Sequence, residues 1–301
     1  TRFYAQRDMG QAQAYMEECL TVMETDPELD EGARGFYLNA HALILMRLGR
    51  LQEAFDLCRD AYERLLARSG HEQFRLQKAI LPHNLGRVKA AMGQHAEAVH
   101  HFTDALEKDP YYSDLYLERG LSLLRLGRAE EAQRDFGRGL EYGLPSPPLA
   151  TGFGNACIAL GRPAEAVPAF TRALELDEDQ VQAYKGRALC LYDLGSHQEA
   201  LADYDRYLSR QPADQEALVN RASLRHDLGD RDGALNDLAE VLRLNPENAA
   251  ALANQAVILA DGQRWDEALA ALDKAIALEP ENDLLLRNRE LLVQAAAGES
   301  A

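Results

Sequence analysis

The residues best suited to catalysis or metal binding occur in this chain without the spacing that such chemistry needs. Histidine clusters at His95, His100 and His101, and the cysteines form neither a CxxC pair nor a mixed cysteine–histidine ligand set. No phosphate-binding glycine loop, HExxH or GxSxG motif is present. Carboxylates are so abundant that no pair of them stands out. We therefore expect no active site, metal or cofactor in this chain, and solvated surface positions for the histidines.

Composition and charge narrow the class of protein further. The net charge is −17, of which residues 1–150 carry −5, and this acidity favours basic partners and disfavours nucleic acid. No apolar run approaches the roughly 18 to 20 residues of a membrane span, so we expect no membrane insertion. Cysteines without disulfide or ligand spacing predict buried thiols of a reducing compartment, for which we expect the cytoplasm. They are Cys19, Cys58, Cys157 and Cys190.

These residues are set in a framework that repeats every 34 residues. Six alanines mark the period, at Ala98, Ala132, Ala166, Ala200, Ala234 and Ala268. Within residues 181–214, apolar residues follow helical spacing up to Gly195, resume it from Ala200 and stop at Pro212. Each unit is therefore predicted to hold a first helix, a turn and a second helix, and to be stable only when packed against its neighbours.

The unit resembles the tetratricopeptide repeat. The residues that carry the resemblance in one unit are Leu85, Gly86, Gly93, Ala98, Phe102, Ala105 and Pro110. The resemblance implies an all-α fold, a right-handed α-solenoid (superhelix) of tandem helix-turn-helix units. We expect a single elongated domain.

The 34-residue spacing also predicts how the chain is divided. Residues 79–280 hold six units in phase, and residues 35–78 hold a first complete unit with a ten-residue insertion, for which longer helices are expected. Residues 1–34 match part of a unit that begins inside its first helix, from which we expect a fragment of a longer protein. Residues 281–301 are expected to form a capping helix and tail, with Leu284, Leu285, Leu291 and Leu292 on its apolar face.

A weak joint is predicted at residues 137–154, where five glycines and three prolines gather. Each glycine inside a helix lowers stability by about 0.5–1 kcal/mol relative to alanine. The segment is interpreted either as slack that the family tolerates or as a hinge.

Arginine at position 7 of a unit occurs together with aspartate at position 23 or not at all. The three pairs are Arg119 with Asp135, Arg187 with Asp203, and Arg221 with Asp237. Because the two positions can face each other across the two helices of a unit, we predict bidentate structural ion pairs.

In the family, the first helix of each unit lines the concave face, and position 13 is one of the lining positions. In this chain that position carries Arg47 and Arg125 early and Asp193, Asp227 and Asp261 late. An aspartate in the last turn opposes the helix dipole, so that local helix stability does not explain the three acids. They are interpreted either as partners of a basic residue on a neighbouring unit, such as Arg225 or Arg231, or as a ladder that receives lysine or arginine from a bound peptide.

Asparagines on the same helices can hydrogen-bond an extended peptide backbone, as in the asparagine ladder of O-linked N-acetylglucosamine transferases. The carboxylate clamp of chaperone-binding repeats is not expected, since only Lys185 and Asn220 match it. Together with their neighbours, these residues form the candidate partner-binding set: Asn39, Arg47, His83, Asn84, Arg87, Arg125, Asn155, Lys185, Tyr192, Asp193, Asn220, Asp227, Asn254 and Asp261.

The sequence thus predicts a protein–protein interaction scaffold that binds a peptide or helix of a partner, and its acidity favours a partner with a basic segment. The alternative is a regulatory or targeting segment of a larger enzyme or sensor whose catalytic domain lies outside these residues.

Overall fold

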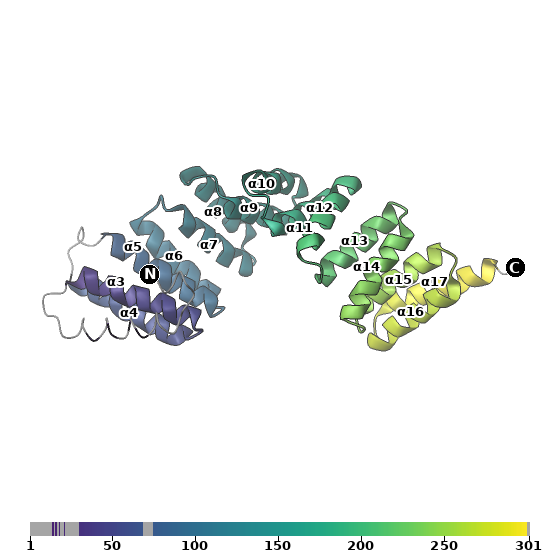
Figure 1. Cartoon of the computed structure of the whole chain (residues 1–301), viewed down its shortest axis with the longest axis horizontal. Helices are drawn as coiled ribbons and strands as arrows, with labels where there is room; N and C mark the ends of the chain where they lie inside the picture. Colours follow the sequence, from purple (N-terminus) through teal and green to yellow (C-terminus); the bar gives the residue numbers. More distant parts are fainter. Residues whose placement is uncertain are drawn as a thin grey trace. The chain divides into compact units, whose positions relative to one another are not determined.

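The computed structural model is built from helices throughout the part of the chain that it describes, which is residues 30–68 and 75–299 and the single positions 14, 16, 18 and 21. Its described residues form fifteen α-helices (Figure 1). Seven precede residue 162: α3 (Glu31–Arg47), α4 (Leu51–Arg68), α5 (Arg75–Ala91), α6 (His95–Lys108), α7 (Ser113–Arg125), α8 (Ala129–Tyr142) and α9 (Pro147–Ala159). Eight follow: α10 (Pro163–Leu176), α11 (Val181–Asp193), α12 (His197–Arg210), α13 (Gln215–Asp227), α14 (Arg231–Leu244), α15 (Ala249–Asp261), α16 (Trp265–Leu278) and α17 (Asp283–Glu299).

The turn between the two helices of a repeat has the same backbone geometry in all seven repeats whose turns the structure describes. Its central residue, at position 15, is left-handed, and six glycines from Gly49 to Gly229 fill it with φ between 68° and 84°. In the last unit the glycine stands one place earlier, at Gly262, yet the backbone keeps the left-handed residue at position 15, which is Gln263 with a φ of 57°. The turn geometry is therefore fixed by the repeat even where the sequence lacks the glycine.

The helices divide into two compact units, residues 1–162 and residues 163–301, where the sequence predicts a single domain. In the first unit, the side chains of Phe102 and Phe136 are fully buried between helices, and in the second Tyr204, Leu238 and Leu272 take the equivalent positions. The division falls between α9 and α10, after the segment predicted to be a joint.

Three of the glycines of residues 137–154 serve close packing inside the first unit. A Cβ on Gly152 would lie 2.5 Å from the Phe136 ring, and one on Gly139 would lie 2.6 Å from Leu149. A Cβ on Gly143 would meet the Ser113 side chain at 2.7 Å. These distances are shorter than side-chain contacts allow, so the glycines are required where neighbouring groups fill the space. The interpretation as slack is therefore wrong for Gly139, Gly143 and Gly152, whereas a Cβ on Gly137 would meet Phe153 at an ordinary 3.8 Å.

The helices at the N-terminal end of the array agree with the sequence predictions. Helices α4 and α5 extend to Arg68 and from Arg75, which makes both longer than their counterparts, as expected for the insertion. The partial unit at residues 1–34 lies almost wholly outside the described residues. Cys58, Cys157 and Cys190 are free buried thiols, as predicted, and Cys19 also lies outside.

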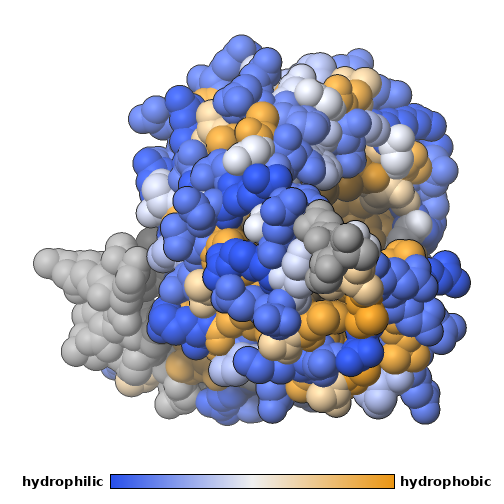
Figure 2. Space-filling model, turned by 90° about the vertical axis from the view of Figure 1, so that its right-hand side faces the viewer, coloured by the Kyte–Doolittle hydropathy of each residue, from blue (hydrophilic) through white to orange (hydrophobic). Residues whose placement is uncertain are grey.

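Helix α17 forms as predicted, but only part of its apolar face is covered. Leu285 and Leu292 are buried, whereas Leu284 and Leu291 are 63% and 58% exposed. Figure 2, which faces this end of the chain, shows hydrophobic side chains among hydrophilic ones at the surface. None of the described helices is both long enough and apolar enough to cross a bilayer.

Candidate partner-binding surface

Three aspartates occupy the same place in consecutive repeats of the second unit. Asp193, Asp227 and Asp261 are the last residues of α11, α13 and α15, and all three are exposed. Because the helices are equivalent, the repeat places the carboxylates on corresponding faces. The acidic series predicted from position 13 is therefore present at the surface.

Two of the three carboxylates bind a residue of the preceding repeat. The Tyr192 hydroxyl donates to Asp227 Oδ2 at 2.9 Å, and His226 Nε2 lies 2.7 Å from Asp261 Oδ2. Tyr192 and His226 both stand at position 12, one repeat before the aspartate that they contact. The hydrogen bond to Asp227, together with partial burial, raises the pKa of Tyr192, so that the phenol, which is protonated at neutral pH in any case, keeps its proton to higher pH.

The third carboxylate, Asp193, makes no hydrogen bond or ion pair with a described residue. In the repeat before Asp193, position 12 is Ile158, and this side chain, unlike those of Tyr192 and His226, has no hydrogen-bond donor. In the described part of the chain, neither Arg225 nor Arg231 pairs with any of the three aspartates. Neighbour pairing does occur, but its donors are a tyrosine and a histidine.

Three of the five predicted asparagines hydrogen-bond another side chain, and the other two have no such partner among the described residues. The Asn84 amide donates to Asn39 Oδ1, and the Asn84 side chain is only 4% exposed, so that this pair joins α3 to α5. The Asn220 side chain hydrogen-bonds the Tyr204 hydroxyl. Asn155 on α9 and Asn254 on α15 have no hydrogen-bond partner among the described side chains.

Lys185 is held within the second unit. Its ammonium lies 3.1 Å from Asp214 Oδ2, at the end of the same repeat, and 2.7 Å from Glu216 Oε2 of the next repeat. Asp214 also caps the N-terminus of α13 by accepting from the Ala217 amide. The lysine therefore links two repeats, and its charge is already neutralised.

In the first unit the predicted basic residues lie at helix ends or in ion pairs. Arg47 and Arg125 are exposed in the last turns of α3 and α7, where a cation favours the helix dipole. Arg87 Nε lies 3.6 Å from Glu118 Oε1 of the next repeat.

His83 is a packed, neutral side chain. Burial lowers its pKa to about 4, with a smaller contribution from Arg87, and its ring meets the edge of Tyr112 at 5.6 Å. The imidazole therefore carries no positive charge at neutral pH.

The three predicted arginine–aspartate pairs all form with bidentate geometry. The two nitrogen–oxygen distances are 2.7 and 2.7 Å for Arg119 with Asp135, 2.6 and 2.8 Å for Arg187 with Asp203, and 2.9 and 2.6 Å for Arg221 with Asp237. The aspartates are buried, with side chains only 5–6% exposed. Each pair joins the two helices of one repeat.

Sequence reasoning missed a third partner of each arginine. The remaining guanidinium nitrogen binds Thr103, Thr171 or Asp205, all at position 25 of the preceding repeat. Arg289 at position 7 of α17 likewise binds Asp273, at 2.6 Å. The signal was available, since among the six repeats in phase those before a position-7 arginine carry a polar residue at position 25 and the other two carry Gly137 and Ala239.

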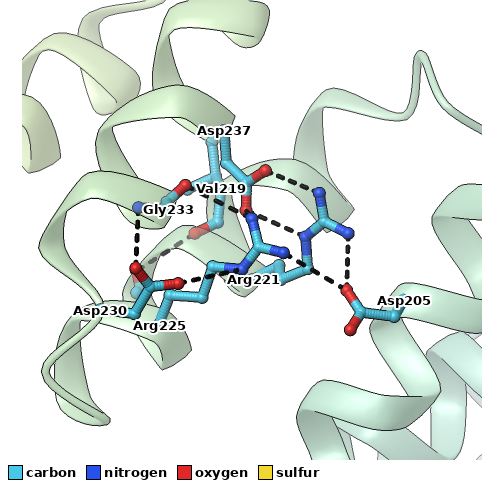
Figure 3. A network of polar contacts seen from close by, with 8 residues as sticks. Asp205, Val219, Arg221, Arg225, Asp230, Gly233 and Asp237 are labelled. Carbon is cyan, nitrogen blue, oxygen red and sulfur yellow. Dashed lines mark hydrogen bonds and ion pairs between the residues drawn. The ribbon is translucent and has the colours of Figure 1, made fainter.

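Around Arg221 the pair grows into a closed network (Figure 3). Arg225 Nη1 also binds Asp237, at 2.9 Å, and further nitrogens of Arg225 lie 3.5 Å from Asp205 and 3.8 Å from Asp230. Two guanidiniums and three carboxylates of α12, α13 and α14 thereby satisfy one another.

The comparisons with known proteins agree with this architecture. Two family models described as tetratricopeptide repeat match residues 33–110 and residues 83–146, 151–216 and 219–283. An uncharacterised protein of Methanocaldococcus jannaschii is 35% identical over 65 residues, which are 22% of this chain and 76% of that protein.

Two solved structures are similar in fold. One is a tetratricopeptide repeat protein of Parabacteroides merdae (TM-score 0.59, 20% identity, 86% of this chain and 98% of that one). The other is PilW, described as a type IV pilus biogenesis factor (TM-score 0.61, 21% identity, 69% of this chain and 97% of that one).

Proposed function

The chain belongs to the tetratricopeptide repeat family, and we propose that its second unit binds a basic segment of another protein on the face formed by α11, α13 and α15. Proteins of this family generally mediate protein–protein interactions, and such repeats are typically non-catalytic scaffolds. The observation that carries the proposal is the exposure of Asp193, Asp227 and Asp261 at one repeat position.

These carboxylates do little for the stability of their own helices. Each stands at a helix C-terminus, where the helix dipole disfavours negative charge. Asp193 is uncommitted, and the contacts of Asp227 and Asp261 involve a single carboxylate oxygen each. All three can therefore still accept hydrogen bonds from lysine or arginine, and a charge-assisted bond of this kind contributes about 1.5–3 kcal/mol where it is shielded from water.

An amide on the same helix as Asp261 supports binding of an extended segment. Asn254 lies on α15 with Asp261 and has no hydrogen-bond partner among the described side chains. A primary amide both donates and accepts, so it can pair with a peptide backbone while the aspartates select basic side chains. A row of such contacts, each of them weak, would give a modest affinity that depends on salt.

The test is a triple variant in which Asp193, Asp227 and Asp261 are each changed to Asn. The probe is a fluorescent peptide of alternating lysine and alanine, and its affinity is measured by anisotropy at low ionic strength. We expect the triple variant to bind at least about tenfold more weakly, which corresponds to about 1.4 kcal/mol. Its thermal unfolding should be unchanged, because the substituted side chains are exposed.

The matched control removes three acids elsewhere on the same unit, through Glu175→Gln, Glu240→Gln and Glu267→Gln. These side chains lie on second helices and pair only with exposed arginines. The net charge changes by the same amount in both triple variants, so we expect the control to lose less than about twofold in affinity. Equal losses in the two variants would show that the peptide responds to overall acidity, and the proposed surface would be wrong.

A further inference from the structure

A small cavity of the first unit is lined by four arginines, although the chain as a whole is strongly acidic. It lies among α6, α7 and α8 and has a volume of about 250 Å³. The charged residues of its lining are Arg119, Arg128, Glu131, Arg134, Asp135 and Arg138.

Two of these arginines are neutralised within the cavity wall. Arg119 is engaged by Asp135 through both of its oxygens, and Arg128 binds Glu131 in the same bidentate manner, at 2.6 and 2.7 Å. These contacts leave no carboxylate of the lining for the other two arginines.

Arg134 and Arg138 carry the uncompensated charge. They are exposed, stand four residues apart on α8 and make no hydrogen bond or ion pair with any described residue. Side chains at this spacing lie on one face of a helix, about 5–6 Å apart at their Cβ atoms. The hydrogen bond from Arg128, with the nearby charges of Arg128, Arg134 and Arg119, lowers the pKa of Glu131, as a positive environment should. The charged lining therefore has a net charge of +2.

The repeat itself does not require this charge. A second cavity, of about 450 Å³, lies beside Arg221 and shares four lining positions with the first, which are held by Arg221, Asp205, Asp237 and Glu240. Glu240 occupies the repeat position that Arg138 occupies in the first unit, and Asp205 occupies the position of Thr103. The four shared positions thus carry two arginines, a threonine and an aspartate in the first unit, and one arginine and three carboxylates in the second. The basic charge of the first cavity therefore depends on its particular side chains.

We propose that the cavity beside Arg134 and Arg138 binds a phosphate monoester group. A guanidinium presents paired N–H donors that match phosphate oxygens, and two free guanidiniums match the charge of about −1.5 to −2 that a phosphate monoester carries at pH 7. The volume lies below the roughly 300–1,000 Å³ of sites that enclose whole drug-sized ligands, which favours a single anionic group. That group reaches the cavity either as free phosphate or on a phosphorylated side chain of a peptide.

The test is calorimetric titration of the full chain with inorganic phosphate, with O-phosphoserine, and with a phosphoserine peptide and its unphosphorylated form. We expect saturable binding of the phosphate-bearing probes. The double variant Arg134→Gln with Arg138→Gln should bind them at least about tenfold more weakly, because both guanidinium groups without an internal partner are removed. The single variant Arg138→Gln should lose less. Circular dichroism should show an unchanged fold, since both side chains are exposed.

The matched control is the double variant Arg172→Gln with Arg206→Gln. These arginines stand at the repeat position of Arg138 in the next two repeats and are also exposed, so the control removes the same two charges. We expect its affinity for phosphate to stay within about twofold of the unsubstituted chain.

The probes identify the source of the phosphate, and both sources support the proposal. Tighter binding of the phosphopeptide than of inorganic phosphate would indicate a phosphorylated partner, and equal binding would indicate free phosphate. Binding should weaken below about pH 6, where the monoester loses its second charge. The proposal is wrong if no phosphate-bearing probe binds saturably, or if the two double variants lose affinity equally.

Discussion

Arg119 in the first unit and Arg221 in the second make the same contacts within their repeats and stand in opposite electrostatic surroundings. Both bind a buried aspartate through two nitrogen atoms and a position-25 residue of the preceding repeat through the third. Around Arg221, Asp205 and Asp230 add two further carboxylates, whereas around Arg119 the added charges are mostly arginines. One unit holds a closed network and the other an open basic cavity.

The difference shows which positions of the repeat set architecture and which are free to vary. Positions 7 and 23 join the two helices, so their pairing is the same wherever it occurs. Position 11 is Leu123 beside Arg119 but Arg225 beside Arg221, and position 16 is Arg128 in one and Asp230 in the other. These variable positions decide whether the buried arginine–aspartate pair belongs to a network in which the charges are balanced, or lines a cavity with an excess of positive charge.

The largest expected effect is on the free energy of unfolding when the buried aspartate of each network, Asp135 or Asp237, is replaced. Asp135→Asn should destabilise the fold by about 3–5 kcal/mol, because Arg119, largely buried beside three other arginines, is left without a carboxylate and keeps only uncharged partners. Asp237→Asn should lose less, about 1–3 kcal/mol, because Asp205 still binds Arg221 and, with Asp230, remains near Arg225. Urea unfolding of both variants measures the difference.

The control for this comparison is Glu131→Gln, which removes a carboxylate from an exposed pair of the same cavity. An exposed ion pair contributes about 0–1 kcal/mol, so this change should be nearly silent. If Asp237→Asn is as damaging as Asp135→Asn, the additional carboxylates of the second unit do not compensate for the lost one, and the contrast drawn here fails.

Much of this architecture could be predicted from the sequence because it depends on spacing. The 34-residue period located the helices, and the joint occurrence of arginine and aspartate located the ion pairs, since both are consequences of one unit repeated. The partners of Asp227 and Asp261 could not be located in this way. Tyr192 and His226 differ in type and appear in only two repeats, so no recurrence marks them.

The glycines of residues 137–154 show a different limit of sequence reasoning. Helix propensity accounts only for the local cost of a glycine relative to an alanine. The role of Gly152 depends instead on Phe136, a residue 16 positions earlier on another helix. The cavity of the first unit was missed for a related reason. Its charge becomes apparent only when the partners of Arg119 and Arg128 are known and Arg134 and Arg138 remain unmatched.

A second contrast concerns the ring at position 24 and the residue at position 6 of the next repeat. Phe136 packs on Gly152 in the first unit and Phe170 packs on Gly186 in the second, whereas Tyr204 hydrogen-bonds Asn220. Gly152→Ala should destabilise the fold by about 1–3 kcal/mol, because the new methyl group would lie 2.5 Å from the ring and the helices would have to separate. Thermal and urea unfolding would measure this loss.

The matched substitution is Gly137→Ala in α8, where a Cβ would meet Phe153 at an ordinary 3.8 Å. There the gain in helix propensity should stabilise the fold by about 0.5–1 kcal/mol. Stabilisation by both substitutions would mean that Gly152 is slack after all, and the close packing of Phe136 would not be what requires the glycine.

The smallest expected effect compares two turns of the second unit that share one geometry. Gly229 and Gln263 both have a positive φ, and the amides of Asp230 and Arg264 close both turns with matching hydrogen bonds of 2.8 and 2.9 Å. A left-handed conformation costs a non-glycine residue about 1–2 kcal/mol, which a glycine avoids. A glycine also makes the unfolded chain more flexible, and this lowers the stability of the fold by about 0.4–1 kcal/mol. Gln263→Gly should therefore stabilise the fold by about 0.5–1 kcal/mol, and Gly229→Gln should destabilise it by a similar amount. Unfolding midpoints of the two variants measure this, and a loss of stability in Gln263→Gly would mean that the glutamine side chain contributes more to the last turn than its backbone strain removes.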